Sequence, residues 1–478
     1  MNYKRILHTL GVVLCFEAAC MILPLICAAI YREAEITAFI KSILICVIFG
    51  VTLALQKSHN KQIYPKEGFV IVALSWIIIS VFGALPFVLS NAIPNFVHAL
   101  FETVSGFTTT GASVLSDVEV LPKCIIFWRS FTHWIGGMGV LVFLVALLPL
   151  SGGSNLFLMK TESTGPSVSK LVPKVKSSAK ILYGIYIGMS FLMLVLLLIG
   201  KMSFFDAITH MFGTAGTGGF GIKNSSVGEY STYNQVVITI FMALFGIDFS
   251  VYYLILIRKF KLLLRSDEVK TYLGIILFST LIICFNCVNL FENIWISLKH
   301  SAFQVSSIIT TTGFSTVDFD RWPELSKTIL VLLMFVGACA GSTGGGIKVS
   351  RILIFVKSIT KEIAIAAHPK LTKKIQMSGR TIEHETVRSV NVFMAAYLTI
   401  FVFSALLISL NNYDFTTNFT AVAATLNNIG PGLAKVGPTA NFSIFSDFSL
   451  LVLIFDMLVG RLEIFPMLVL FSKYTWKK

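Results

Sequence analysis

Apolar segments long enough to cross a lipid bilayer recur along the whole chain, and they restrict its fold more than any other feature. Of the 478 residues, 55% are hydrophobic and only 13% are charged, whereas about a quarter of the residues in a soluble domain carry charge. Because a membrane-spanning helix needs ~20 apolar residues, we predict an all-α, polytopic membrane protein, and the uninterrupted runs exclude strands and barrels. The expected spans are residues 8–31, 37–55, 68–90, 124–150, 181–200, 235–257, 271–291, 327–340, 389–410 and 446–471.

Four short segments that end in a glycine turn interrupt the apolar pattern at comparable places. Irregular backbone is excluded from hydrocarbon but is tolerated where it lines a water-filled path. Any single turn can equally be a packing site between membrane helices, but four turns in the same setting predict one pore with four walls. The chain is therefore a cation conductor by hypothesis. The segments are residues 108–113, 216–220, 310–315 and 427–432.

A stretch too short to span the bilayer precedes each turn, as expected for a re-entrant half-helix. If its carboxyl end points to the membrane centre, its carbonyl dipoles favour a cation beyond the turn. Glycine allows successive carbonyls to face inward, and hydroxyls such as those of Thr110 and Thr312 can add oxygen ligands. Asp206 and Asp414, near two of the starts, are expected to cap free N–H groups. The half-helices are residues 93–107, 204–212, 298–310 and 415–425.

Each half-helix and turn lies between two apolar helices. This order predicts four M1-P-M2 repeats (helix, re-entrant pore helix, helix) around one pore, preceded by two extra helices. We expect an N-terminal two-helix pair at residues 1–60 and repeats at residues 61–165, 166–265, 266–380 and 381–478.

The net charge of +14 is concentrated in short basic loops, which mark the cytoplasmic side of a membrane protein. All of these loops and both chain termini can lie on that side if every glycine turn re-enters from the other side. Acidic residues such as Asp117, Glu229 and Asp318 then lie opposite. The sequence has no compact basic domain, so nucleic acid is excluded as a partner. The basic segments are the N-terminus and residues 57–66, 160–180, 258–270, 348–380 and 473–478.

No catalytic constellation accompanies the apolar segments. A membrane enzyme would need a clustered set such as His-Glu-x-x-His or paired intramembrane carboxylates, and the sequence contains neither. Cys284 and Cys287 lie in an apolar segment without a second cysteine pair or a histidine cluster, so we expect buried free thiols. We therefore expect no enzyme activity and no cofactor in this chain.

A run of small residues breaks the apolar helix of the third repeat. Each glycine inside a helix destabilises it by about 1 kcal/mol relative to alanine, so a helical conformation is unfavourable for this run. It is not a phosphate loop, because Ile347 rather than lysine follows Gly346. We expect an intramembrane loop at residues 340–348 that can obstruct the path below the turns, and an inert helix kink is the alternative. Its residues are Gly341, Ser342, Thr343, Gly344, Gly345, Gly346 and Lys348.

Arg461 is a charged residue inside the last apolar segment. It lies twelve residues before Lys473, or ~18 Å along a helix, and is too deep to reach the interface. Facing the pore, it would raise the barrier for cations. Facing a neighbouring helix, it would form an ion pair with Asp248 or Asp456. A charge at this depth is a functional-site hypothesis by default.

Three further ionisable residues, Glu102, Arg129 and His133, lie in or near apolar segments. Glu102 can sit on a half-helix surface behind the first turn, and Arg129 can anchor at the outer interface. We assign no chemistry to the three residues.

These motifs together resemble the Trk/Ktr/HKT superfamily of potassium transporters, and more closely its TrkH branch, over nearly the whole chain. The two helices before residue 60 look like the extra N-terminal pair of that branch, which the shorter Ktr subunits lack. The likeness rests on the four turn segments and on residues 128–130, 134–139, 340–348 and 460–463.

The resemblance implies a potassium-binding selectivity filter with one glycine from each turn: Gly111, Gly219, Gly313 and Gly430. Gly219 is chosen over its neighbour because a phenylalanine follows it, as in the third turn. Only two walls carry Thr-Thr-Thr-Gly, so the unequal filter should be less strictly selective and should pass rubidium as well as potassium. The resemblance also assigns residues 340–348 a gating role and turns Arg461 towards the pore. The filter residues are Thr109, Thr110, Gly111, Thr217, Gly218, Gly219, Thr311, Thr312, Gly313, Asn428, Ile429 and Gly430.

By the same resemblance, the chain would take up potassium through a gated pore in the bacterial plasma (inner) membrane, driven by the membrane potential. Family members work as homodimers and dock a cytoplasmic nucleotide-binding regulatory ring, TrkA in this branch. The basic residues 348–380 are a candidate docking surface, and contact with membrane lipid headgroups is an equal competitor. Coupling to a proton or sodium ion stays open. The alternatives are a Ktr-type sodium-dependent potassium-translocating subunit and a broken-helix small-solute carrier, which would have two inverted halves.

Overall fold

The computed structural model describes residues 1–56, 64–139, 175–259, 265–372 and 374–476. Helices dominate this part of the chain, as expected, and six of them are long and apolar enough to cross a membrane, or seven if a bent pair counts as one span. The end of the expected span 124–150 and parts of the basic segments 57–66, 160–180 and 258–270 lie outside the described residues.

The expectation that the chain has no strands is wrong at one short hairpin. Strands β1 (Gln376–Met377) and β2 (Arg380–Thr381) pair antiparallel. Ser378 and Gly379 between them have φ of 53° and 76°, which is the geometry of a tight two-residue hairpin turn. The hairpin lies in the basic segment that precedes the last repeat, away from the expected spans.

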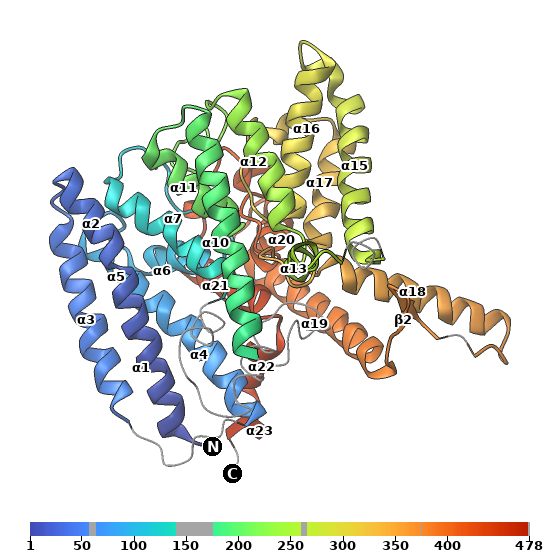
Figure 1. Cartoon of the computed structure of the whole chain (residues 1–478), viewed down its shortest axis with the longest axis horizontal. Helices are drawn as coiled ribbons and strands as arrows, with labels where there is room; N and C mark the ends of the chain where they lie inside the picture. Colours follow the sequence, from blue (N-terminus) through green and yellow to red (C-terminus); the bar gives the residue numbers. More distant parts are fainter. Residues whose placement is uncertain (57–63, 140–174, 260–264, 373, 477–478) are drawn as a thin grey trace.

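The two N-terminal helical segments pack side by side at one edge of the molecule (Figure 1). Helices α1 (Tyr3–Cys20) and α2 (Ile22–Tyr31) form one apolar segment, and α3 (Ile36–Ala54) packs along α1. A β-carbon on Gly11 would lie 2.5 Å from the carbonyl oxygen of Gly50. Small residues therefore bring the two backbones close together, as is common between membrane helices.

Four short helices occupy the positions of the expected half-helices. Each begins at an Asn, Ser or Asp whose side chain accepts a hydrogen bond from a first-turn N–H group, which satisfies donors that a helix start leaves unpaired. Asp414 is such a cap, as expected. Asp206 is not, because it lies within the first turn and Ser203 is the cap. The helices are α6 (Phe96–Phe107), α11 (Phe204–Ala215), α16 (Ile294–Ile309) and α20 (Phe415–Leu426).

Longer helices lead into the short ones, and another helix follows each turn. The leading helices are α4 (Pro65–Gly83) with α5 (Leu85–Leu89), α10 (Val175–Ile199), α15 (Asp267–Cys287) with η1 (Val288–Leu290), and α19 (His384–Ile408) with η3 (Ser409–Asn411). The following helices are α7 (Lys123–Gly137), α12 (Thr232–Phe245), α17 (Glu324–Val336) and α21 (Asp447–Arg461). The short turns η2 (Phe319–Arg321), η4 (Ala434–Val436) and η5 (Phe442–Ile444) lie in the connecting loops.

The helices that follow the turns stop early, so the expected single spans 235–257 and 446–471 are wrong. Helix α13 (Phe249–Leu256) is bent by 92° from α12. Helix α21 ends at Arg461, and α22 (Phe465–Phe471) and α23 (Lys473–Trp476) follow after Glu463 and Ile464 with positive φ. The helical distance expected between Arg461 and Lys473 therefore does not apply. In the third unit, an irregular segment separates α17 from α18 (Val349–Ala367).

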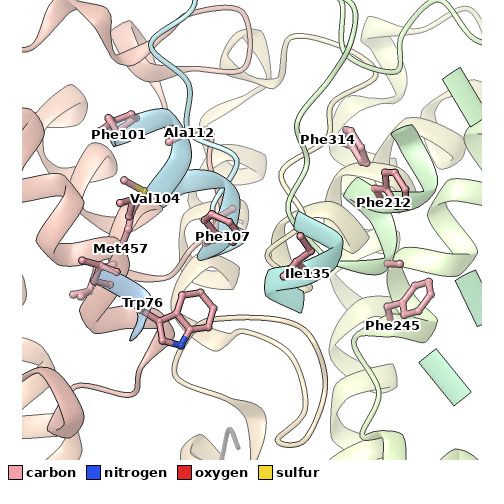
Figure 2. Packing of buried hydrophobic residues seen from close by; sticks show 14 of the residues in the cluster. Trp76, Phe101, Val104, Phe107, Ala112, Ile135, Phe212, Phe245, Phe314 and Met457 are labelled. Atoms are coloured by element: carbon pink, nitrogen blue, oxygen red, sulfur yellow. The ribbon is translucent and has the colours of Figure 1, made fainter. Parts of the chain in front are cut away.

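Buried apolar side chains fix the short helices relative to one another. Most of them form one cluster that includes residues from nearly every described helix, and Ala179 and Tyr183 form a small separate cluster. Figure 2 shows Val104 of α6 near Met457 of α21, and Phe314 close to Phe212 of α11. Because dense packing permits little movement, the carboxyl ends of the short helices are held in fixed positions.

A candidate ion filter and the loop beneath it

The four short helices end in the same backbone motif. In each, the residue two places before the expected filter glycine is left-handed, with φ between 55° and 59°. The next N–H group donates a 2.8 Å hydrogen bond back to the carbonyl five residues earlier. This is a Schellman ending, which usually has glycine at the left-handed position. Here the left-handed residues are Thr109, Thr217, Thr311 and Asn428.

The expected filter glycines also share one conformation. Gly111, Gly219, Gly313 and Gly430 have φ of 81°, 75°, 86° and 98°, which residues with a β-carbon rarely adopt. Gly218 is absent from the residues with positive φ, so Gly219 is the equivalent of the other three. Gly218 corresponds instead to Thr110, Thr312 and Ile429 of the other turns.

The four turns touch each other in a closed ring. A β-carbon placed on each glycine would collide with the carbonyl oxygen of the residue before the glycine in the next turn. The ring runs from the first turn through the second, third and fourth and back to the first, so no side chain fits without moving a neighbouring carbonyl. The distances from the placed β-carbon to the carbonyl oxygen are 2.1 Å for Gly111 and Gly218, 1.8 Å for Gly219 and Thr312, 2.0 Å for Gly313 and Ile429, and 2.8 Å for Gly430 and Thr110.

Threonine hydroxyls hold the turns from within the protein. The Thr110 hydroxyl lies 2.8 Å from that of Thr108, and the Thr312 hydroxyl lies 2.8 Å from that of Thr310. The Asn428 side-chain amide donates a 2.9 Å hydrogen bond to the Thr110 hydroxyl, which links the fourth turn to the first. These bonds fix the turns, whereas the Thr109 hydroxyl and the Asn428 side-chain oxygen have no hydrogen-bond partner among the described residues.

A hollow of about 160 Å³ lies on the side of the ring that faces the loops after the turns. All four filter glycines line it, together with the residues that follow them. Among its described lining residues, Arg129 and Lys223 carry positive charge and none is a carboxylate. Each cation has a carboxylate partner: Arg129 lies 2.6 Å from Glu102, and Lys223 lies 2.7 Å from Glu229. The mouth is therefore polar without a strong net charge of its own.

The loops that follow the turns join in a second ring around this hollow. Asn224 donates a 2.8 Å hydrogen bond to Asp117 across the first and second loops, and this bond lowers the pKa of Asp117. The hydrogen bond from Lys223 likewise lowers the pKa of Glu229. Both carboxyl groups therefore stay charged at neutral and mildly acidic pH. The other links are Val227 N–H to Ser315 O at 3.0 Å, Ala434 N–H to Asp320 Oδ1 at 3.1 Å and Phe442 N–H to Ser113 O at 2.8 Å.

The irregular segment of the third unit lies directly against the carboxyl ends of two short helices. A β-carbon on Gly344 would lie 2.9 Å from the Thr310 carbonyl oxygen, and one on Gly345 would lie 2.6 Å from that of Asn427. The Gly345 N–H group also donates a 2.6 Å hydrogen bond to the hydroxyl of Thr311. The segment begins at Gly337, which has a φ of 73°, three residues before the expected boundary. Residues 337–348 are called the intramembrane loop below.

A glutamate closes the base of the intramembrane loop. Glu268 of α15 accepts hydrogen bonds from the N–H groups of Ala340 at 2.7 Å and Ser350 at 3.2 Å. Lys348, with a φ of 85°, donates from its ammonium group to the carbonyl of Gly344. The loop is thus held at both ends and from within, in a conformation that a continuous helix does not have.

Arg461 reaches the middle of the loop. Its guanidinium donates to the Thr343 carbonyl at 2.8 Å and to the carbonyls of Gly136 and Gly137, at the end of α7, at 2.6 and 2.8 Å. The two acids considered as its partners have other contacts. Asp248 accepts from the backbone N–H of Ser250, and Asp456 accepts from the hydroxyl of Ser404. Arg461 therefore connects the loop to the first and fourth units.

The sequence interpretation overlooked a buried ion pair behind the filter. Glu102 lies behind the first turn, as expected, but Arg129 is buried and bonded to it rather than at an exposed interface. The pair could have been predicted from the opposite charges of Glu102 and Arg129 in neighbouring apolar segments, since buried charges need partners. Cys284 and Cys287 are buried free thiols, as expected.

Comparison with known proteins matches this architecture. The family model described as "TrkH: Cation transport protein" covers residues 35–477. The chain is 35% identical to the Trk system potassium uptake protein TrkH of Salmonella typhimurium and 34% identical to that of Escherichia coli, over 100% of each chain. It is also similar to the crystal structure of the potassium transporter TrkH from Vibrio parahaemolyticus, with a TM-score of 0.90, 31% identity and full coverage of both chains.

Proposed function

Because this chain belongs to the TrkH family of cation transport proteins, we propose that it takes up potassium through a gated, selective pore formed by its four glycine turns. The observation that carries the proposal is the closed ring, in which each filter glycine abuts a carbonyl of the next turn. A ring of carbonyl oxygens can replace the hydration shell of an alkali cation. The carboxyl ends of four short helices add partial negative charge at the same place.

The walls of this filter are unequal, and we propose that it passes rubidium with potassium. The first and third turns contain Thr-Thr-Thr-Gly, whereas the second has Gly218 and the fourth has Asn428 and Ile429 at the corresponding places. The filter residues are those at positions 109–111, 217–219, 311–313 and 428–430. Potassium is the transported substrate, and we propose no cofactor and no enzyme activity for the chain.

The intramembrane loop and Arg461 form the proposed gate. The loop lies against the inner ends of two short helices, and Arg461 holds its middle at the Thr343 carbonyl. In this position the loop obstructs the path below the filter, and the guanidinium raises the barrier for a cation. Opening requires the loop to leave its bonds to Thr311 and Arg461.

The proposed location is the inner membrane, with both termini in the cytoplasm, because the basic loops mark that side. Inward flux is then driven by the membrane potential, worth about 2.3 kcal/mol per charge per 100 mV. The N- and C-terminal ends of the described chain lie close together on one side of the molecule in Figure 1, which supports a common side.

We propose a homodimer that docks a cytoplasmic nucleotide-binding ring similar to TrkA. Helix α18 projects from the bundle in Figure 1, and it exposes Val356 by 53%, Ile359 by 46% and Ile363 by 65%. At this spacing the three side chains form one apolar stripe. A stripe on a projecting helix supports contact with a second copy, and the basic residues 348–380 support contact with the ring or with lipid headgroups.

Rubidium uptake by bacteria that lack their own potassium transporters tests the function. We expect cells that express this chain to accumulate rubidium, and potassium to compete with it. The measurement is repeated with and without external sodium. A strict sodium requirement would favour a Ktr-type mechanism, and no uptake above that of cells with an empty vector would contradict the proposal.

A further inference from the structure

The buried pair Glu102 and Arg129 links the first two walls of the filter and is not repeated in the other walls. Glu102 lies on α6, nine residues before Gly111. The residues at the same place before the other filter glycines are His210, Gln304 and Ala421. The first wall is therefore the only one of the four with a carboxylate at this position.

Glu102 contacts the backbone that leaves the first turn. Its carboxylate accepts hydrogen bonds from the Ser113 hydroxyl at 3.0 Å and from the Val114 N–H group at 3.0 Å. Its other strong contact is the Nε of Arg129 at 2.6 Å. Three donors surround one carboxylate whose side chain is fully buried, so the orientation of Glu102 is fixed.

Arg129 contacts the backbone that leaves the second turn. Its guanidinium donates a 2.9 Å hydrogen bond to the Gly221 carbonyl, two residues after Gly219. The same group lies 3.5 Å from the ring centre of Phe220, a distance at which a cation and an aromatic face attract each other. A planar guanidinium can make these contacts and the bond to Glu102 at once, whereas a lysine ammonium cannot.

We propose that Glu102 and Arg129 are positioning residues that hold the first and second turns at one spacing and thereby set how well the pore distinguishes potassium from sodium. The inference rests on the proposed filter. A buried ion pair is costly to desolvate and contributes little net stability. What this pair can contribute is a fixed position of the first turn relative to the second. Selection between ions of different size depends on where the carbonyls are held.

The test measures how strongly potassium and sodium compete with rubidium uptake in cells that express full-length variants. We expect Glu102→Gln and Arg129→Lys to lower the preference for potassium over sodium by about tenfold, which corresponds to about 1.4 kcal/mol of differential binding. Arg129→Lys keeps the positive charge but loses the hydrogen bonds that the planar guanidinium makes in fixed directions. This variant therefore shows whether discrimination depends on those bonds or on the charge alone.

Two further variants keep the test decisive. Glu102→Gln combined with Arg129→Gln leaves no unpaired buried charge, so it should fold, as checked by thermal unfolding, and still lose discrimination. Glu17→Gln is the matched control: Glu17 is 3% exposed and its carboxylate has no hydrogen-bond partner among the described residues. It should keep the parent's discrimination.

The outcomes separate this inference from the proposed function. If the parent transports rubidium and the folded double variant or Arg129→Lys discriminates as the parent does, the pair is not a positioning device. If Glu17→Gln loses discrimination equally, the effect is not specific to the filter, and the inference fails. A parent without rubidium uptake would overturn the proposed function together with the inference.

Discussion

The proposed filter glycines are constrained twice, once by their own backbone and once by the neighbouring turn. Positive φ excludes most side chains, and the carbonyl of the next turn occupies the place of a β-carbon. The sequence was sufficient to locate the four glycine turns, because they interrupt the apolar segments, and the resemblance singled out one glycine in each. The role of these glycines in a filter stays a prediction. The left-handed conformation of Thr109, Thr217 and Thr311 could not be predicted from the sequence, because threonine rarely adopts it.

The hydroxyl of Thr311 provides the first prediction. It accepts the N–H of Gly345, and Thr311→Val would leave that buried donor unpaired at a cost of roughly 1–3 kcal/mol. The closed loop is destabilised, so rubidium uptake should rise about fivefold or more. Thr217→Val is the matched control, because the Thr217 hydroxyl bonds to Gly216 and not to the loop. Equal uptake by the two variants would contradict the role of Thr311.

At the scale of elements, the helices after the turns are the main difference between expectation and structure. Residues 235–257 and 446–471 are mostly apolar, although charged residues such as Asp248 and Arg461 lie within them, so their length and hydropathy indicated single spans. The breaks arise from local contacts instead. Asp248 caps α13 through the Ser250 N–H group, and the backbone reverses at Glu463 and Ile464. Gly246 lies in the first break, and Pro466 lies in the first turn of α22. These residues are local signals of a helix end and a helix start, whereas hydropathy alone does not locate either break.

The second prediction concerns the intramembrane loop and Arg461. Arg461→Ala removes three hydrogen bonds, including the one to the Thr343 carbonyl, so the loop should open more often and potassium uptake should rise. Arg461→Lys keeps the positive charge but cannot reproduce the directed hydrogen bonds of the guanidinium, so its uptake should lie between that of the parent and that of Arg461→Ala. Uptake is compared at equal amounts of folded protein in the membrane. Loss of folded protein in both variants would indicate a structural role instead of a gate.

At the scale of the whole molecule, the motifs were sufficient to identify the family, and the full-length matches bear this out. The closure of the ring could not be predicted in the same way. It depends on contacts between turns more than 90 residues apart, such as Gly313 with Ile429 and Gly430 with Thr110. Such contacts exist only after the helices have packed. The domain boundaries at 61–165, 166–265, 266–380 and 381–478 stay predictions.

The third prediction concerns assembly. Ile359→Ser combined with Ile363→Ser makes the exposed stripe of α18 polar. We expect the proposed dimer to dissociate at least partly, as measured by light scattering of purified protein in detergent. Leu277→Ser combined with Leu281→Ser on α15 is the control, because these residues are also exposed, by 62% and 41%, and have the same spacing. An unchanged mass for the α18 variant would contradict the proposed interface.

The central claim is that the four glycine turns form one filter, and ion discrimination by glycine variants tests it most directly. Serine is introduced separately at Gly111, Gly219, Gly313 and Gly430, and potassium and sodium are compared as competitors of rubidium uptake. Each substitution displaces a carbonyl of the next turn, so all four variants should lose discrimination or uptake. Gly188→Ser is the control, since a β-carbon there would meet nothing within 4 Å. A folded filter variant with the parent's uptake and discrimination would contradict the account.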